Sequence, residues 1–178
     1  MLRFAGMRLV VAGALVSATA LGCKSVTEPH EAELASLRSA TRDFADVTAA
    51  AEAGYTAQLT PCLSDPALGG MGFHIGNPGR INGTVELERP EVLLYEPRIV
   101  DFPELVAVEY IVPFEAWTAA SPPVLMGQTF TRNEAFGVWA LHVWLYKENP
   151  AGIFADWNPR VSCAAAPSEV GGSTPMRH

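Results

Sequence analysis

The chain has 178 residues, with 12 Lys+Arg against 19 Asp+Glu and a net charge of −7. This acidic balance excludes nucleic acid and an anionic membrane surface as electrostatic partners, because both need a basic face. Hydrophobic residues at 49% and charged residues at 17% exclude a disordered chain, and the length supports one domain with a real core.

Residues 1–22 have the pattern of a signal peptide. Residues 1–8 form a short basic start, and an apolar run over residues 9–16 follows it. The run is too short to span a bilayer as a stable helix. Removal of this leader takes away two arginines and no acidic residue, so the net charge of the mature chain becomes −9.

The leader ends in Ala20-Leu21-Gly22-Cys23, which resembles the lipobox of bacterial lipoproteins. In that class the cysteine is acylated and becomes the new N-terminus. The resemblance implies a lipid on Cys23, a polar tether over residues 23–31 and attachment to a membrane of the cell envelope, facing the periplasm or the exterior. The alternative is an A-x-A cleavage site at residues 18–20, which would release a soluble secreted protein that begins at Leu21.

The three cysteines are Cys23, Cys62 and Cys163. If Cys23 carries lipid, an even pair remains, and outside the cytoplasm such a pair is normally oxidised. We therefore predict a disulfide between Cys62 and Cys163. The alternative is a thiolate ligand or nucleophile, although neither cysteine has C-x-x-C spacing or a neighbouring histidine.

Helical signals occupy residues 31–54. One apolar stripe repeats at helical spacing, and it consists of Leu34, Leu37, Thr41 and Phe44. Asp46 stands where a second N-cap would, and Gly54 is a natural stop. The pattern predicts one kinked helix or two short ones that cover a sheet.

The pattern changes after Gly54, where prolines and glycines crowd residues 61–79 and predict a loop. Strand signals, bounded by turn residues and without a helical period between them, follow over residues 92–96, 105–112, 124–130 and 136–146. The fold class predicted is therefore α+β, with an N-terminal helical segment packed on an antiparallel sheet or small β-barrel and one disulfide. The domain spans 32–163, and we expect a disordered tail over 164–178.

Two of the apolar strands each contain one ionisable residue. By alternation Glu109 shares a face with Leu105, Ala107 and Ile111, and His142 shares one with Val138, Ala140 and Trp144. Glu96 ends the strand over 92–96, and His74 lies in an apolar step of the glycine-rich segment. A buried carboxylate without a partner costs several kcal/mol or changes its pKa until it is neutral, so Glu109 needs a partner.

His74, Glu96, Glu109 and His142 are thus candidate ligands of a divalent metal ion, because an N/O donor set suits Zn, Mn or Fe. Two alternatives are a hydrogen-bonded pair in the core and a metal-free acid–base or small-ligand site. The four tryptophans could line an apolar pocket, although aromatic residues in strands more often belong to the core. We expect His30 and His178, in the tether and the tail, to be solvated.

Several motifs also resemble a group of uncharacterised bacterial exported proteins, many of them predicted lipoproteins. They are Gly70 to His74 with Asn77-Pro78, Arg89 to Pro97, Val108 to Tyr110, Leu141 to Leu145, Asn149 to Gly152, and Trp157 to Pro159 with Cys163. The resemblance covers roughly residues 35–163. It implies an exported protein and brings no established activity with it.

Three functions remain open from the sequence. The first is an exported, lipid-anchored protein that binds a small ligand or a metal ion in a pocket of histidine and glutamate side chains. The second is a metal-dependent or acid–base enzyme that uses the same residues. The third is a structural protein of the cell envelope whose buried polar residues only bond to one another.

Overall fold

The computed structural model of the chain describes Met1 and residues 29–167. The expected lipidation site Cys23, nearly all of the expected leader and His178 lie outside the described residues. Among those described, no helix is long and apolar enough to cross a membrane.

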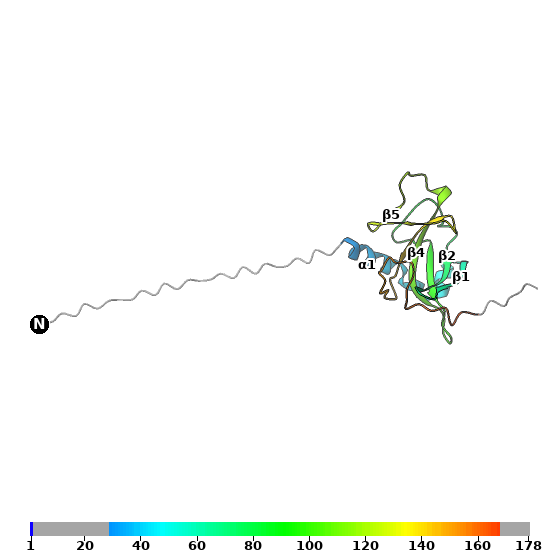
Figure 1. Cartoon of the computed structure of the whole chain (residues 1–178), viewed down its shortest axis with the longest axis horizontal. Coiled ribbons are helices and arrows are strands. Elements are labelled where there is room, and N and C mark those ends of the chain that lie inside the picture. The colour runs from blue at the N-terminus through cyan, green and yellow to red at the C-terminus, as the bar shows by residue number, and fades with distance from the viewer. Residues whose placement is uncertain (2–28, 168–178) are drawn as a thin grey trace, which may run out of the picture.

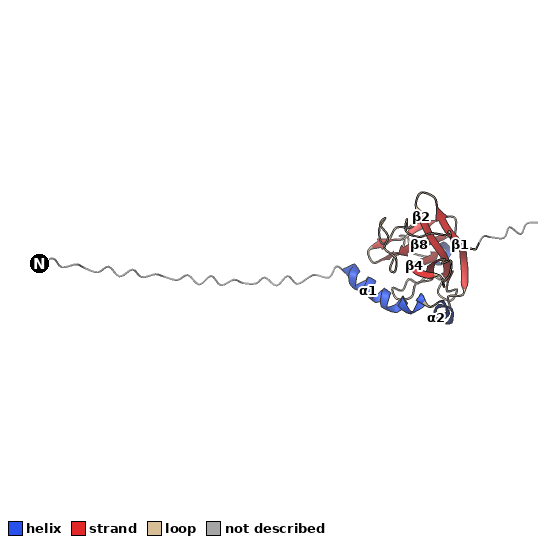
Figure 2. Cartoon of the chain, turned by 90° about the horizontal axis from the view of Figure 1, so that it is seen from below, coloured by secondary structure: helices blue, strands red, loops and turns tan. Residues whose placement is uncertain are grey.

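The N-terminal part of the described chain is helical. It consists of α1 (Pro29–Thr41), the short 3-10 helix η1 (Arg42–Ala45) and α2 (Val47–Glu52). Asp46 begins α2, and its side chain accepts a hydrogen bond from the backbone N–H of Thr48 at 2.8 Å, as an N-cap should. In Figure 2 these helices lie along one side of the sheet.

A curled antiparallel sheet forms the body of the α+β domain, in the strand order β1-β2-β3-β4-β8-β7. The sheet resembles half of a barrel, with β1 and β7 at its edges (Figures 1 and 2). Its strands are β1 (Ala57–Asp65), β2 (Gly69–Gly76), β3 (Val92–Glu96), β4 (Glu104–Pro113), β7 (Thr131–Asn133) and β8 (Val138–Val143). A 3-10 turn, η2 (Phe114–Ala116), follows β4.

The two faces of the sheet carry two different apolar clusters. The first cluster includes Leu93, Tyr110 and Val143 of the sheet, together with Leu37 of α1 and Ala50 of α2. The second lies on the opposite face and gathers Val92, Leu94, Val106, Ala107, Ile111, Ala140, Trp144 and Val161. Strand alternation therefore gives the sheet a helix-covered face and a second face that is free to form a site.

The prediction of a loop over residues 61–79 was wrong, because β1 and β2 form the longest contact of the sheet there. The glycines serve close packing of backbone segments as well as turns. At Gly72, where φ is 89°, a Cβ atom would lie 2.4 Å from the carbonyl oxygen of Tyr95 on β3. Only glycine allows this approach, so the residue that suggests a loop is part of a strand.

The prediction of a single strand over residues 124–130 is also wrong. The segment forms a hairpin of β5 (Val124–Leu125) and β6 (Gln128–Thr129). Met126 and Gly127 connect them with φ values of 49° and 67°, which a two-residue hairpin turn of the primed type requires. Met126 is buried, and that burial offsets the unusual backbone of a residue other than glycine.

Leu105 does not share a face with Glu109. Leu94 and Tyr95 of β3 pair with Ala107 and Leu105 of β4, so β4 contains one extra residue at this point. Such a bulge reverses the alternation on one side of it. Leu105 accordingly belongs to the helix-covered cluster, whereas Ala107 and Ile111 remain on the face of Glu109.

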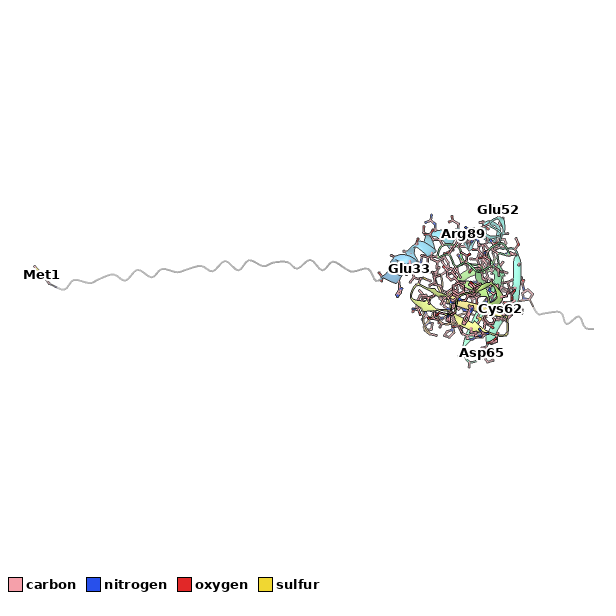
Figure 3. All side chains as sticks on the ribbon, turned by 90° about the horizontal axis from the view of Figure 1, so that it is seen from above. Met1, Glu33, Glu52, Cys62, Asp65 and Arg89 are labelled. Carbon is pink, nitrogen blue, oxygen red and sulfur yellow. A yellow bond between two sulfur atoms is a disulfide. The ribbon has the colours of Figure 1, made fainter. Side chains whose placement is uncertain are left out.

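The predicted disulfide is confirmed, since Cys62 on β1 (labelled in Figure 3) is bonded to Cys163. It joins positions 101 residues apart and attaches the C-terminal segment to an edge of the sheet. A β-bridge between Gly70 and Asn158 lies beside it. Together they hold residues 156–163 against β1 and β2, as expected for a segment joined to this region.

Glu91 is buried immediately before β3, and its Oε2 accepts a hydrogen bond from the backbone N–H of Ile111 at 3.1 Å. Burial raises its pKa from 4.5 to about 8, against the opposing effect of backbone hydrogen bonds and Arg80. The folded protein therefore holds a proton that the unfolded chain releases. The contribution of protonated Glu91 to the free energy of unfolding is fully present below about pH 4.5 and is lost as pH rises toward 8.

We expect Glu91→Gln to remove this decrease in the free energy of unfolding with rising pH, because glutamine does not titrate. Between pH 5 and 8 the wild-type free energy of unfolding should fall relative to the variant, by up to about 1.4 kcal/mol per pH unit. Urea unfolding at several pH values measures the difference. Parallel pH profiles for the two proteins would contradict it.

Candidate functional site

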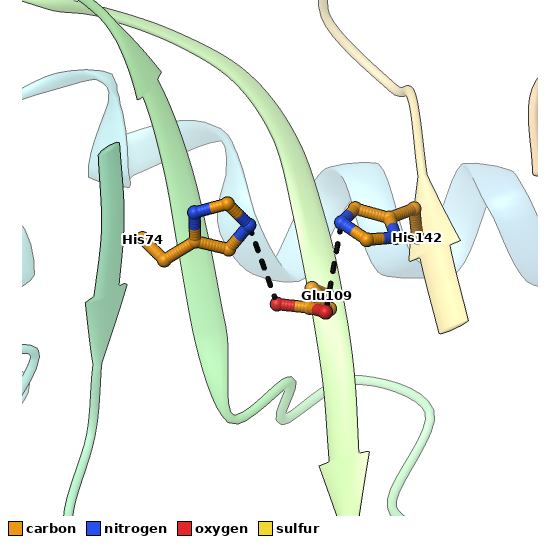
Figure 4. Close-up of side chains that lie close together, drawn as sticks. All are labelled: His74, Glu109 and His142. Carbon is orange, nitrogen blue, oxygen red and sulfur yellow. Dashed lines mark ion pairs between the residues drawn. The ribbon is translucent and has the colours of Figure 1, made fainter. Parts of the chain in front are cut away.

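Three predicted residues meet on the face of the sheet that the helices leave free. His74 of β2 and His142 of β8 approach the carboxylate of Glu109 on β4 from either side (Figure 4). The distance from His74 Nε2 to Glu109 Oε2 is 3.7 Å, and that from His142 Nε2 to Glu109 Oε1 is 3.5 Å. One nitrogen or oxygen atom from each of the three residues lies within 4.8 Å of the others.

The register of the sheet explains this meeting. Glu109 and His142 are direct partners in the β4–β8 pairing, so their side chains leave the same face side by side. His74 pairs with Leu94 of β3, and Leu94 pairs with Ala107 of β4. Because Ala107 precedes Glu109 by two residues on the same face, the imidazole of His74 reaches the carboxylate across β3.

All three side chains are buried, with 4–6% of each residue exposed. Both ring nitrogens of His142 are buried, and among the described residues neither makes a hydrogen bond. A buried polar atom that lacks a partner costs about 1–3 kcal/mol and calls for an explanation. An atom bound between the three side chains would supply the missing partner of Nε2, whereas Nδ1 faces Asp156 on the other side of the ring.

Each imidazole also has an oxygen atom behind it. His74 Nδ1 lies 2.8 Å from Thr60 Oγ1, within hydrogen-bond distance. His142 Nδ1 lies 3.4 Å from the carboxylate of Asp156. Metal-binding histidines usually have such a partner on their other nitrogen, which orients the ring and directs the free nitrogen toward the ion.

The two histidines differ in pKa. Burial lowers the pKa of His74, and the positive charge of a protonated His142 would add to this effect. Burial also opposes the charged form of His142, but Glu109 and Asp156 outweigh it and raise the pKa of this ring. Contact with His142 in turn lowers the pKa of Asp156 despite its partial burial. The environment therefore disfavours the charged form of His74 and favours that of His142.

The two contacts that Glu109 makes, one with each of its oxygen atoms, are closer to the ligand–ligand spacing around an ion than to hydrogen-bond length. Two ligand atoms about 2.05 Å from one tetrahedral ion lie roughly 3.3 Å apart. The two nitrogen–oxygen distances, 3.5 and 3.7 Å, are slightly longer than that. Small side-chain rotations would close the difference, and two imidazoles with one carboxylate are a donor set for Zn, Mn or Fe.

A cavity of about 450 Å³ opens over the cluster, and His74, Glu109 and His142 all line it. Trp157 forms part of its wall, while Trp144 stacks on His142 with the ring centres 6.5 Å apart. One tryptophan thus lines a pocket, as the sequence suggested for some of them. A second lies nearly parallel to the ring of a candidate ligand.

Glu96 does not join this group, and the prediction is corrected at that position. Its carboxylate bonds to Lys147 and accepts a hydrogen bond from the backbone N–H of Ser162 at 2.8 Å. On β3 it is Val92 that pairs with Glu109. Glu96 lies four residues further along, or about 13 Å at the rise of a strand, which is beyond reach.

Sequence reasoning missed Thr60 and Asp156. Thr60 immediately precedes the segment that was expected to be a loop and lay in no predicted element, and Asp156 follows the last strand in a region without a regular pattern. A signal was present for Asp156, because the disulfide brings its segment toward the strand that contains His142. His30, expected to be solvated, is half-buried on α1 and lies 3.6 Å from Glu33.

Comparison with known proteins gives no match among protein-family models, curated proteins or solved structures. The function must therefore be inferred from the chemistry of the site itself.

Cys62 lies on β1 between Thr60 and Leu63, which line the pocket, so removal of the disulfide should loosen this wall. We expect Cys62→Ser with Cys163→Ser to lower the free energy of unfolding by about 2–5 kcal/mol. Urea unfolding of the oxidised protein and the double variant measures the change. Equal stability of the two proteins would show that the C-terminal segment stays in place without the bond.

Proposed function

We propose that this protein is an exported binding protein whose pocket holds one divalent metal ion between His74, Glu109 and His142. The observation that carries the proposal is the buried His142 Nε2, which makes no hydrogen bond with the described residues and faces Glu109 in a cluster of three candidate ligand atoms beneath a cavity. Three protein ligands leave coordination positions for a water molecule or a small ligand. A structural protein would need no such opening.

A metal-free acid–base site is the second candidate. The carboxylate of Asp156, 3.4 Å from Nδ1, favours a protonated His142 beside Glu109, and this pair could transfer a proton to a molecule in the cavity. The two candidates differ in one measurable property, because only the first requires a metal ion in the protein.

We further propose that the chain is attached to a bacterial membrane through a lipid on Cys23. The lipobox-like sequence Ala20-Leu21-Gly22-Cys23 supports this proposal, and so do the resemblance to exported proteins and the disulfide, since disulfides persist in oxidising compartments. A tether of a few residues would keep the pocket close to the membrane surface.

Metal content tests the first proposal. We expect about one equivalent of Zn, Mn or Fe per chain, measured by plasma mass spectrometry on protein exported to the periplasm and purified without a polyhistidine tag or chelator. The variant His74→Ala with His142→Ala should retain less than about a tenth of it, because it loses two of the three ligands.

Glu96→Gln is the matched control, because it changes a buried carboxylate outside the cluster and should retain the metal. Circular dichroism establishes that each variant is folded. Folded wild-type protein that stays metal-free after dialysis against each of the three ions would refute the metal centre and favour the acid–base site.

The N-terminus tests the anchor. Protein extracted from bacterial membranes should begin at an acylated Cys23, and Cys23→Ala should move it to the soluble fraction. Mass spectrometry of the intact protein and its N-terminal peptide measures both. An unmodified N-terminus at Leu21 in the wild-type protein would exclude the lipid.

A further inference from the structure

The cavity provides few polar groups apart from the three candidate ligands. Thr60 and Asn133 are the other polar residues among those described that line it, and none of them is Lys or Arg. The hydroxyl of Thr60 already lies 2.8 Å from His74 Nδ1. With no lysine or arginine among the described lining residues, the metal ion would be the main electrostatic partner for an anionic group on a bound molecule.

The rest of the wall is apolar. Side chains from several separate segments of the chain form it, among them Leu63, Met71, Ile81, Ile111, Val138 and Trp157. A molecule that fills the cavity would exchange water for apolar contact over most of its length, which favours an occupant with an apolar body.

Two large apolar side chains of the lining remain exposed to solvent. Leu59 on β1 is 41% exposed, and Phe136 in the turn between β7 and β8 is 58% exposed. Exposed apolar surface beside a cavity is typical of a ligand-binding groove. An occupant with an apolar body would cover both residues as it enters.

From these features, and on the basis of the metal centre proposed above, we infer that the pocket takes a small apolar monoanion such as a medium-chain carboxylate. Its carboxylate coordinates the ion between His74, Glu109 and His142. Its hydrocarbon body lies along the apolar wall toward Leu59 and Phe136.

Charge and volume both restrict the ligand. A divalent ion and the carboxylate of Glu109 together carry one positive charge, which a monoanion neutralises inside an apolar cavity where an unbalanced charge is costly. The carboxylate of Asp156 lies outside the cavity lining, and solvent screens its charge because its side chain is 47% exposed. The volume of about 450 Å³ is in the range for small-molecule sites and suits an acid of about ten non-hydrogen atoms. A dianion or an amine would leave a net charge buried.

Octanoate is the probe, titrated by calorimetry into mature protein whose metal content has been measured in the same sample. We expect octanoate to bind at least about tenfold more tightly than octanol, which lacks the charge. Butyrate, with four fewer methylene groups, should also bind at least about tenfold more weakly than octanoate. Octylammonium should not bind, and the His74→Ala, His142→Ala variant should lose octanoate binding.

A pair of phenylalanine variants tests the apolar wall. Phe136→Ala should weaken octanoate binding several-fold without changing metal content. Phe102→Ala is the matched control, because Phe102 is 80% exposed on the loop between β3 and β4 and does not line this cavity. It should leave octanoate binding unchanged.

The outcomes separate the two proposals. Stoichiometric metal with octanoate no tighter than octanol would overturn the carboxylate ligand and leave the metal centre intact. Equal binding of octanoate to metal-loaded and metal-free protein would overturn coordination by the ion. Wild-type protein that binds no metal would overturn both proposals together.

Discussion

The arrangement of the site depends on one carboxylate, that of Glu109, which the β4–β8 pairing places in the apolar face of a sheet opposite His142. Moving a charged carboxylate out of water costs several kcal/mol unless other groups compensate it. Two imidazoles lie nearest to it, that of His142 on the neighbouring strand β8 at 3.5 Å and that of His74 on β2, beyond β3, at 3.7 Å. The fold must therefore hold β2, β4 and β8 in fixed register, because a slip of one residue would turn any of the three side chains to the other face.

The C-terminal segment over residues 156–163 adds further side chains to the site that the strand register forms. It has no regular secondary structure of its own, yet the disulfide and the Gly70–Asn158 bridge attach it to β1 and β2. This attachment places Asp156 behind His142 and Trp157 in the wall of the cavity. A covalent link between distant positions thus provides an outer partner for one ligand and closes one side of the pocket.

The sequence predicts the parts of this structure that depend on local pattern. Alternation in the strands correctly placed Glu109 with Ala107 and Ile111, and His142 with Ala140 and Trp144, on one apolar face. The errors arose where tertiary contacts override local signals. Glycines that admit a neighbouring strand at Gly72 look like loop residues, and the bulge that turns Leu105 away depends on how β4 pairs with β3. Glu96 alternates correctly on its strand, but only the strand register reveals that it lies too far from Glu109.

A closed network of protein groups is the other way to compensate Glu109, and the distances argue against it. A charge-assisted hydrogen bond between nitrogen and oxygen is about 2.7–2.9 Å long. In the same cluster, His74 Nδ1 lies 2.8 Å from Thr60 Oγ1, which is the length of a normal hydrogen bond. The carboxylate contacts stay longer by more than half an ångström, and both nitrogens of His142 remain without a hydrogen bond in the described structure. Side chains that stop short of one another beneath an open cavity support our proposal that an ion is bound between them.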